Sequence, residues 1–230
     1  MLRDGINGLM SVVWPDRCAV CGRRLTRDEK LLCLACEVDI PRTNIHLDDF
    51  SEIHKRLGHK VRIERAASYF YYIPGGGYAA LIHEAKYHNR PGTGRKLARG
   101  FAEELKSTGF FDGIDGIAAV PLHYSKLLGR GYNQSRYIAS GLGDVTGIKI
   151  VDILKCSRAH STQTRKSALE RWRNVKDIYK ARSCGDCKHI LVVDDVLTTG
   201  STLAACCEAI AAVNPGVKIS VLTLGLAGIS

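Results

Sequence analysis

The sequence lacks any run of about 18 apolar residues, the length that a membrane-spanning helix needs, so we expect no membrane span. It contains neither the GxxxxGKS/T loop of P-loop ATPases nor the HExxH motif of zinc proteases, because the histidine after His83-Glu84 comes one residue too late. Acidic residues are also scarce, with 23 against 33 lysines and arginines, and the formal net charge is +10. That charge predicts an anionic partner, either a polyphosphate or a nucleic acid.

The excess of positive charge is concentrated in one segment. Between Lys155 and Arg182 there are nine lysines and arginines against two acidic residues, Glu170 and Asp177. Runs of like charge are usually solvated faces, and that ordinary interpretation stays open here. The alternative is that the segment contacts the anionic partner.

Cysteine occurs nine times, and four of the cysteines form two CxxC pairs near the N-terminus. Cys18-x-x-Cys21 and Cys33-x-x-Cys36 are separated by eleven residues, a pattern that can close a tetrahedral shell of four thiolates around Zn²⁺. Because four thiolates leave no open position on the ion, we expect a structural zinc. Two interlocked disulfides are the alternative, but polar residues interrupt the apolar positions of the N-terminus, so we expect a reducing cytoplasm and no secretory signal.

A third CxxC pair, Cys184 and Cys187, stands alone. It lies in a predicted hairpin turn over residues 183–188, with Gly185-Asp186 at the tip. A redox-active pair normally opens a helix, whose dipole lowers the thiol pKa. We therefore interpret this pair as part of a turn.

Residues 190–202, ILVVDDVLTTGST, carry the strongest functional signal. Four apolar residues predict a buried strand, and two carboxylates, Asp194 and Asp195, follow at its carboxyl end. A loop of small residues follows and leads into a helix. The N–H groups and hydroxyls of this loop can hold a phosphate at the positive end of the helix. Paired carboxylates beside such a loop accept hydrogen bonds from ribose hydroxyls, so the segment predicts a sugar-phosphate site. The acidic strand of an ATPase is the alternative, but the chain lacks the P-loop that would accompany it.

This constellation resembles the signature of type I phosphoribosyltransferases, which bind phosphoribosyl pyrophosphate. In that family two adjacent acids after a hydrophobic strand contact the ribose diol, and a TTG-type loop grips the 5′-phosphate. The resemblance implies the same division of work between Asp194-Asp195 and the loop that follows.

Predicted strands and helices alternate along most of the chain. We expect strands at 117–120, 150–154, 190–194 and 217–224, and helices at 78–87, 94–106, 134–145 and 201–213. Such alternation favours an α/β fold with a mostly parallel sheet flanked by helices. We divide the chain into an N-terminal helix and zinc ribbon at 1–42, a linker at 43–60, and a type I phosphoribosyltransferase-like domain at 61–230.

Five motifs in order resemble the ComF family, the competence-associated proteins with a zinc ribbon ahead of a phosphoribosyltransferase domain. They are the paired CxxC, IHEAKYHNRPGTG, AVPLH followed by LLGRGYNQS, SRAHSTQTRKSALERWRN, and LVVDDVLTTGSTL. The resemblance implies that Asp194 and Asp195 hold the ribose, directly or with Mg²⁺. It also implies a lid over residues 157–176, whose Arg158 and Arg165 would act as catalytic residues. The other contacts implied for phosphoribosyl pyrophosphate are Val196, Leu197, Thr198, Thr199, Gly200, Ser201, Thr202, Arg130, Gln163, Arg171 and Lys86.

The function implied is Mg²⁺-dependent transfer of phosphoribosyl to an acceptor that the sequence does not identify, in a cytoplasmic protein associated with DNA uptake. Two non-catalytic alternatives stay open, because a fold does not dictate an activity. One is binding of single-stranded DNA, and the other is sensing of phosphoribosyl pyrophosphate without turnover. Other competence proteins are expected partners in each case.

Overall fold

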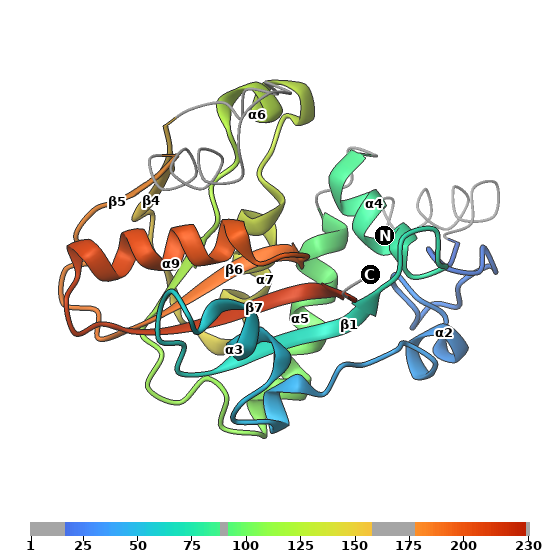
Figure 1. Cartoon of the computed structure of the whole chain (residues 1–230). Coiled ribbons are helices and arrows are strands. Elements are labelled where there is room, and N and C mark those ends of the chain that lie inside the picture. The colour runs from blue at the N-terminus through green and yellow to red at the C-terminus, as the bar shows by residue number, and fades with distance from the viewer. Residues whose placement is uncertain (1–16, 88–91, 158–177, 229–230) are drawn as a thin grey trace, which may run out of the picture.

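The computed structural model describes residues 17–87, 92–157 and 178–228. Its centre is a five-stranded sheet in the order β1-β7-β6-β2-β3, in which every neighbouring pair runs parallel. The strands are β1 (Ala66–Tyr72), β2 (Gly116–Ala119), β3 (Lys149–Ile150), β6 (His189–Leu197) and β7 (Lys218–Ala227). The predicted α/β fold with a mostly parallel sheet is confirmed (Figure 1).

Helices cover both faces of the sheet (Figure 1). On one face lie α4 (Ala79–Tyr87), α5 (Gly92–Lys106) and α7 (Gln134–Thr146), and on the other lie α3 (Glu52–Leu57) and α9 (Ser201–Val213). The remaining described helices are α2 (Leu34–Val38), the 3-10 helix η1 (Ile45–Leu47) and α6 (Tyr124–Arg130). α6 has no buried residue and projects beyond the sheet on the side where the strands end.

The apolar residues of β6 pack against the helices on both faces of the sheet. Leu191 and Val193 belong to the cluster beneath α5 and α7, whereas Ile190 and Val192 belong to the cluster beneath α3 and α9. All four side chains are fully buried. This is why the strand reads as a continuous hydrophobic run rather than as an alternating one.

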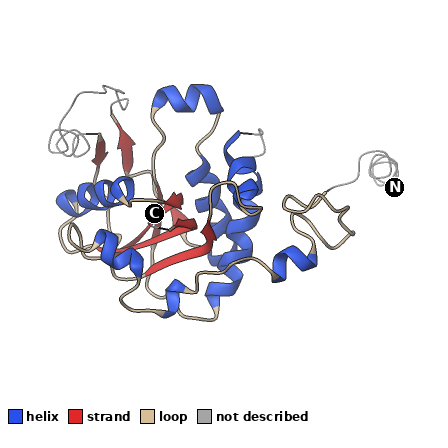
Figure 2. Cartoon of the chain, turned by 45° about the vertical axis from the view of Figure 1, so that its right-hand side comes forward, coloured by secondary structure: helices blue, strands red, loops and turns tan. Residues whose placement is uncertain are grey.

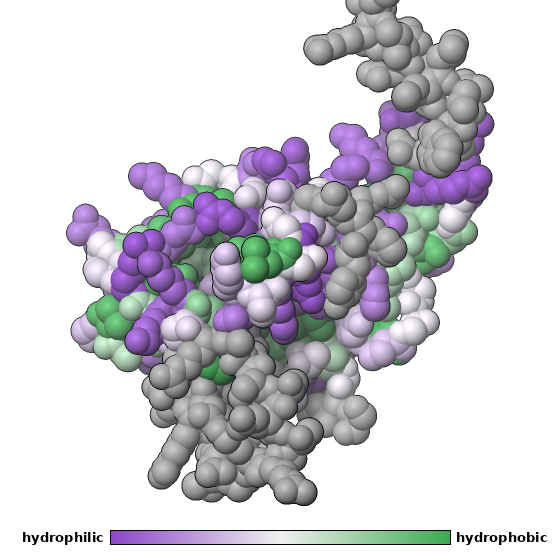
Figure 3. Space-filling view, turned by 90° about the horizontal axis from the view of Figure 1, so that it is seen from above, coloured by the Kyte–Doolittle hydropathy of each residue, from purple (hydrophilic) through white to green (hydrophobic). Residues whose placement is uncertain are grey.

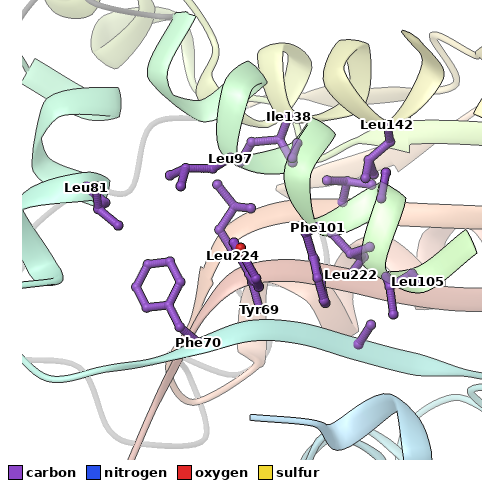
Figure 4. Close-up of a cluster of buried hydrophobic side chains, with 14 of the residues drawn as sticks. Tyr69, Phe70, Leu81, Leu97, Phe101, Leu105, Ile138, Leu142, Leu222 and Leu224 are labelled. Carbon is purple, nitrogen blue, oxygen red and sulfur yellow. The ribbon is translucent and has the colours of Figure 1, made fainter. Parts of the chain in front are cut away.

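The first of these clusters, shown in Figure 4, depends on a close contact between α5 and α7. A side chain at Gly141 would place its Cβ 2.4 Å from the Arg95 carbonyl oxygen, so only glycine allows the two helices to approach this far. Beneath them, the rings of Tyr69 and Phe101 stack with centroids 4.6 Å apart. The close contact between α5 and α7 keeps α7 beside the sheet. The N-terminus of α7 lies at the edge of the sheet where the strands end.

Residues 43–60, which show no periodicity in the sequence, fold into η1 and α3 and bury Ile45, Ile53 and Leu57 against α9 and the sheet. The predicted division of the chain at residues 42 and 60 stays a prediction. In the described ranges, no helix is both long enough and apolar enough to cross a membrane.

Two local details differ from the sequence-based expectations. The strand expected at 150–154 is divided, because β3 joins the main sheet while β4 (Leu154–Cys156) pairs antiparallel with β5 (Tyr179–Ala181) in a separate two-stranded sheet. Residues 183–188 therefore do not close a hairpin, since β5 and β6 lie in different sheets. They do form a turn, in which the Cys184 N–H donates to Asn214 Oδ1 at 2.8 Å.

Candidate functional site

Asp194 and Asp195 lie near the carboxyl end of β6, which is flanked by β2 and β7. In open α/β sheets, ligands bind at this edge. Ser135, in the first turn of α7, donates its hydroxyl to Asp194 Oδ1 at 2.9 Å, and the Asp195 N–H donates to the same oxygen at 2.9 Å. These two bonds fix the orientation of the Asp194 carboxylate.

The Asp194 carboxyl has an unusual proton affinity. Desolvation, followed by the negative charge of Asp195, raises its pKa from 3.8 to about 7. The folded state therefore holds this proton more tightly than the unfolded chain does, so this group lowers the free energy of unfolding progressively as pH rises from 3.8 to about 7.

We expect Asp194→Asn to become more stable than the original chain across that interval, and to keep its advantage at higher pH. The asparagine retains an oxygen that accepts from Ser135, but it has no charge to desolvate. Urea unfolding of both proteins at a series of pH values measures the difference. A difference that does not change with pH would contradict the raised pKa of Asp194.

Lys86 pairs with the second acid. Its Nζ lies 3.1 Å from Asp195 Oδ2, and the two side chains are 22% and 14% exposed. Lys86 stands in the last turn of α4, so this ion pair joins a helix beside the sheet to the diacid. The sequence predicted Lys86 as a contact of the ligand, and the structure places it at the diacid itself.

The loop after the diacid has the geometry expected for an anion site. Val196 and Leu197 complete β6, and Gly200 adopts a φ of 78° as the N-cap of α9. Thr199 Oγ1 and Ser201 Oγ lie 3.0 Å apart, and Thr198, Thr199 and Ser201 are exposed. Within the described part of the chain, the N–H groups of Thr199, Gly200 and Thr202 have no hydrogen-bond partner. These donors and hydroxyls lie at the positive end of a 13-residue helix, where an anion is stabilised.

A cavity of about 180 Å³ opens beside the diacid. Its lining is Lys86, Val120, Pro121, Leu122, His123, Lys126, Arg130, Asn133, Gln134, Ser135, Tyr179, Asp194, Asp195 and Thr202. It therefore brings together five of the predicted site residues from four elements, α4, α6, β6 and α9. Seen from above, this side of the molecule is mostly hydrophilic, with hydrophobic residues in separate groups (Figure 3).

Sequence reasoning missed two residues of the first turn of α7, Gln134 and Ser135. Gln134 is 3% exposed, and within the described chain its Nε2 has no hydrogen-bond partner, although Arg130 donates to its Oε1 at 3.2 Å. A buried amide without an acceptor is costly unless a ligand completes it. The available signal was Asn133, whose side chain accepts from the Ser135 N–H and caps the helix.

The four cysteines of the predicted zinc ribbon come together. The sulfurs of Cys18, Cys21, Cys33 and Cys36 all lie within 4.8 Å of one another, and those of Cys21 and Cys33 are 3.6 Å apart. Zn–S bonds of about 2.3 Å in a tetrahedron separate the sulfurs by about 3.8 Å, so the cluster has the size of a Zn²⁺ site. Burial opposes ionisation of Cys18, but backbone N–H donors, that of Cys21 foremost, lower the pKa of its thiol to about 6. The donor set fits a structural zinc.

The backbone around this cluster supports the same interpretation. Gly22, directly after Cys21, has a φ of 72°, the left-handed conformation that glycine adopts without strain. The segment lies at one edge of the molecule as a loop-rich ribbon (Figure 2). Tyr78 donates its hydroxyl to the Cys36 carbonyl at 2.9 Å, and Lys96 donates to the Lys30 carbonyl at 3.3 Å, so the ribbon is docked on the helical layer beside it.

The predicted lid residues Arg158, Gln163, Arg165 and Arg171 lie outside the described residues. Their roles stay predictions. The two ends of that segment are held together, since β4 precedes it and β5 follows it in the same two-stranded sheet.

Comparison with known proteins supports the family resemblance independently of the structure. Residues 128–229 match the phosphoribosyl transferase domain, a range that includes α7, the diacid and the loop. DNA utilization protein YhgH of Escherichia coli is 31% identical over 191 residues, which cover 81% of this chain and 80% of the relative. The protein of the same name from Salmonella typhimurium is 29% identical over the same shares. Competence protein F of Haemophilus influenzae is 31% identical over 130 residues, or 54% of this chain and 57% of the relative. The order of motifs, the parallel sheet, the four-cysteine cluster and these relatives together show that the chain belongs to the ComF family of phosphoribosyl transferase domain proteins.

Proposed function

We propose that the chain binds phosphoribosyl pyrophosphate, together with Mg²⁺, beside Asp194 and Asp195 and transfers its phosphoribosyl group to an acceptor. The observation that carries this proposal is the adjacency of a diacid and a hydroxyl-bearing loop at the carboxyl edge of a parallel sheet. Carboxylates accept hydrogen bonds from the ribose diol, and the loop over residues 198–202 holds the 5′-phosphate.

The part of the cavity lined by α6 and the start of α7 suits the pyrophosphate. Lys126 and Arg130 supply positive charge there, and Gln134 supplies an amide donor at the start of α7. Cleavage at C1 of the sugar develops positive charge on the ring and negative charge on the leaving group, so fixed donors at that group lower the barrier. We assign the lid arginines Arg158, Arg165 and Arg171, with Gln163, to the same task.

Mg²⁺ suits this site because carboxylate and phosphate oxygens are the ligands that it prefers. When bound with pyrophosphate, it supplies charge neutralisation for the leaving group. Lys86 already pairs with Asp195, which reduces the negative charge that the diacid offers to a free cation. We therefore expect the ion to enter with the pyrophosphate rather than before it.

Isothermal titration with phosphoribosyl pyrophosphate, with and without Mg²⁺, tests the proposal. Product analysis with candidate amines and bases then separates an enzyme from a sensor that binds without turnover. The zinc ribbon has a structural role in this scheme, and its four thiols suit a reducing compartment such as the cytoplasm.

A second candidate function is binding of single-stranded DNA, with other competence proteins as partners. The relatives are called DNA utilization and competence proteins, and the net charge of this chain is +10. Lys126, Lys155 and Lys180 are exposed on α6, β4 and β5. This function could coexist with the first.

We expect the affinity for a single-stranded oligonucleotide to fall by at least about tenfold between about 50 and about 200 mM salt, because bound phosphates release counterions. Fluorescence anisotropy at several salt concentrations measures the slope. An affinity that is insensitive to salt would reject DNA binding through these charges.

A further inference from the structure

The short helix α3 lies directly against the loop that we assign to the 5′-phosphate. Leu57 is fully buried and packs closely against Gly200. A Cβ added at Gly200 would lie 2.8 Å from Leu57 Cδ2. α3 precedes this loop by more than 140 residues in the chain, and no motif in the sequence indicates a role for it. The contact shows that α3 and the loop share one packed interface.

Arg56 is the polar centre of that interface. Its guanidinium donates to the carbonyl oxygens of Thr198 and, at 2.9 Å, of Ala227, while its Nε donates to Glu52 at 3.1 Å. The side chain is only 8% exposed. One planar fork therefore joins α3, the loop and the end of β7, a geometry that lysine cannot reproduce with a single ammonium group.

The bond to Thr198 has a consequence for the loop. In a trans peptide, the C=O of one residue and the N–H of the next point in opposite directions. When Arg56 holds the Thr198 carbonyl, it also turns the Thr199 N–H to the opposite side of that peptide. The Thr199 N–H is one of the loop donors without a protein partner within the described chain, so its direction is set by a residue that lies behind it.

We propose that Arg56 is a positioning residue for the phosphate loop: it fixes the Thr198–Thr199 peptide so that the loop is arranged for a sugar phosphate before the ligand arrives. This inference rests on the proposed function. Donors that are already oriented bind an anion more tightly, because less conformational freedom is lost on binding. Arg56 acts through the loop and touches no ligand itself.

The test compares two partial ligands, ribose 5-phosphate and pyrophosphate with Mg²⁺, by isothermal titration of the full chain. In Arg56→Met we expect the affinity for ribose 5-phosphate to fall by about tenfold, the effect of weakening one oriented hydrogen bond to phosphate. The affinity for pyrophosphate should stay within about twofold, because that subsite lies on the wall formed by α6 and α7.

Arg42→Met is the matched control. Arg42 also forms a three-acceptor tether, with its Nε and Nη2 donating to Glu104 at 3.0 and 2.8 Å and its Nη1 to the Glu37 carbonyl at 3.1 Å, but it does not contact the loop. The Arg42 side chain is 30% exposed against 8% for Arg56, so this variant should lose less stability, and it should retain both affinities. Arg56→Lys keeps the charge without the fork, and it carries the test if Arg56→Met does not fold.

The outcomes separate the two claims. If the original chain binds neither ribose 5-phosphate nor phosphoribosyl pyrophosphate, the proposed function fails. If it binds them, and Arg56→Met and Arg56→Lys bind ribose 5-phosphate equally well, only the positioning role fails. An equal loss for both partial ligands would show a general structural effect and would also overturn the positioning role.

Discussion

Asp194→Asn/Asp195→Asn protein is expected to lose at least about 100-fold in affinity for phosphoribosyl pyrophosphate, since hydrogen bonds to charged groups contribute about 1.5–3 kcal/mol each. The two substitutions keep the size of the side chains, and the amide that replaces the Asp194 carboxylate still offers an oxygen to Ser135, whereas the ion pair between Asp195 and Lys86 is lost. Above the Asp194 pKa of about 7, what disappears is the pair of charged acceptors for the proposed ribose diol and for any Mg²⁺ between them. Isothermal titration in the presence of Mg²⁺ measures the loss.

Asp144→Asn provides the control for this experiment. Asp144 forms a bidentate ion pair with Arg95, at 2.7 Å for each bond, at the far end of α7 from the cavity. This substitution removes a carboxylate and an ion pair from α7, but at a distance from the proposed ligand site. The affinity should therefore be unchanged. Equal affinity in the diacid variant and in the original chain would disprove the proposed site.

Removal of zinc is expected to unfold the N-terminal ribbon. In small zinc peptides, the metal contributes about 10–16 kcal/mol to folding, far more than a ribbon of this size can gain from its own apolar contacts. Cys33 is 1% exposed, so Cys33→Ser should abolish the site and release the metal. Metal analysis should give one zinc per original chain, and hydrogen exchange should show loss of protection in residues 17–40 after chelation.

Cys184→Ser is the control for the zinc experiment. Cys184 lies in a turn outside the four-cysteine cluster, so this variant should retain one zinc. The competing disulfide arrangement predicts that no zinc is found and that the four ribbon cysteines resist alkylation even after chelation, until a reductant is added. A Cys33→Ser protein that still binds zinc at the original affinity would contradict the four-thiolate site.

The prediction from sequence succeeded where the signal was local. The expected helix at 201–213 coincides with α9, and the expected strand at 190–194 lies within β6, because the apolar run and the small-residue loop are adjacent in the chain. The strand expected at 150–154 was wrong in detail. Residues 151–153 separate β3 from β4, which lie in different sheets, and their pairing with β2 and β5 is not encoded within those few residues.

Segment 43–60 shows the limit of the same reasoning. Ile53 and Leu57 lie four residues apart, as on one face of a helix, but η1 and α3 are each too short for such a spacing to repeat and be recognised in the sequence. Only the assembled fold shows that Arg56 and Leu57 contact the loop over residues 198–202.

The sequence by itself determined the chemistry that neighbours in the chain can supply: two adjacent carboxylates, a hydroxyl-bearing loop and two CxxC pairs. The tertiary structure decided which residues complete that chemistry. Ser135 reaches Asp194 across 59 residues and Arg56 reaches Thr198 across 142, and Lys86 reaches Asp195 from another helix. Such partners depend on how whole helices pack against the sheet, which is settled by the summed burial of many side chains and not by any short motif.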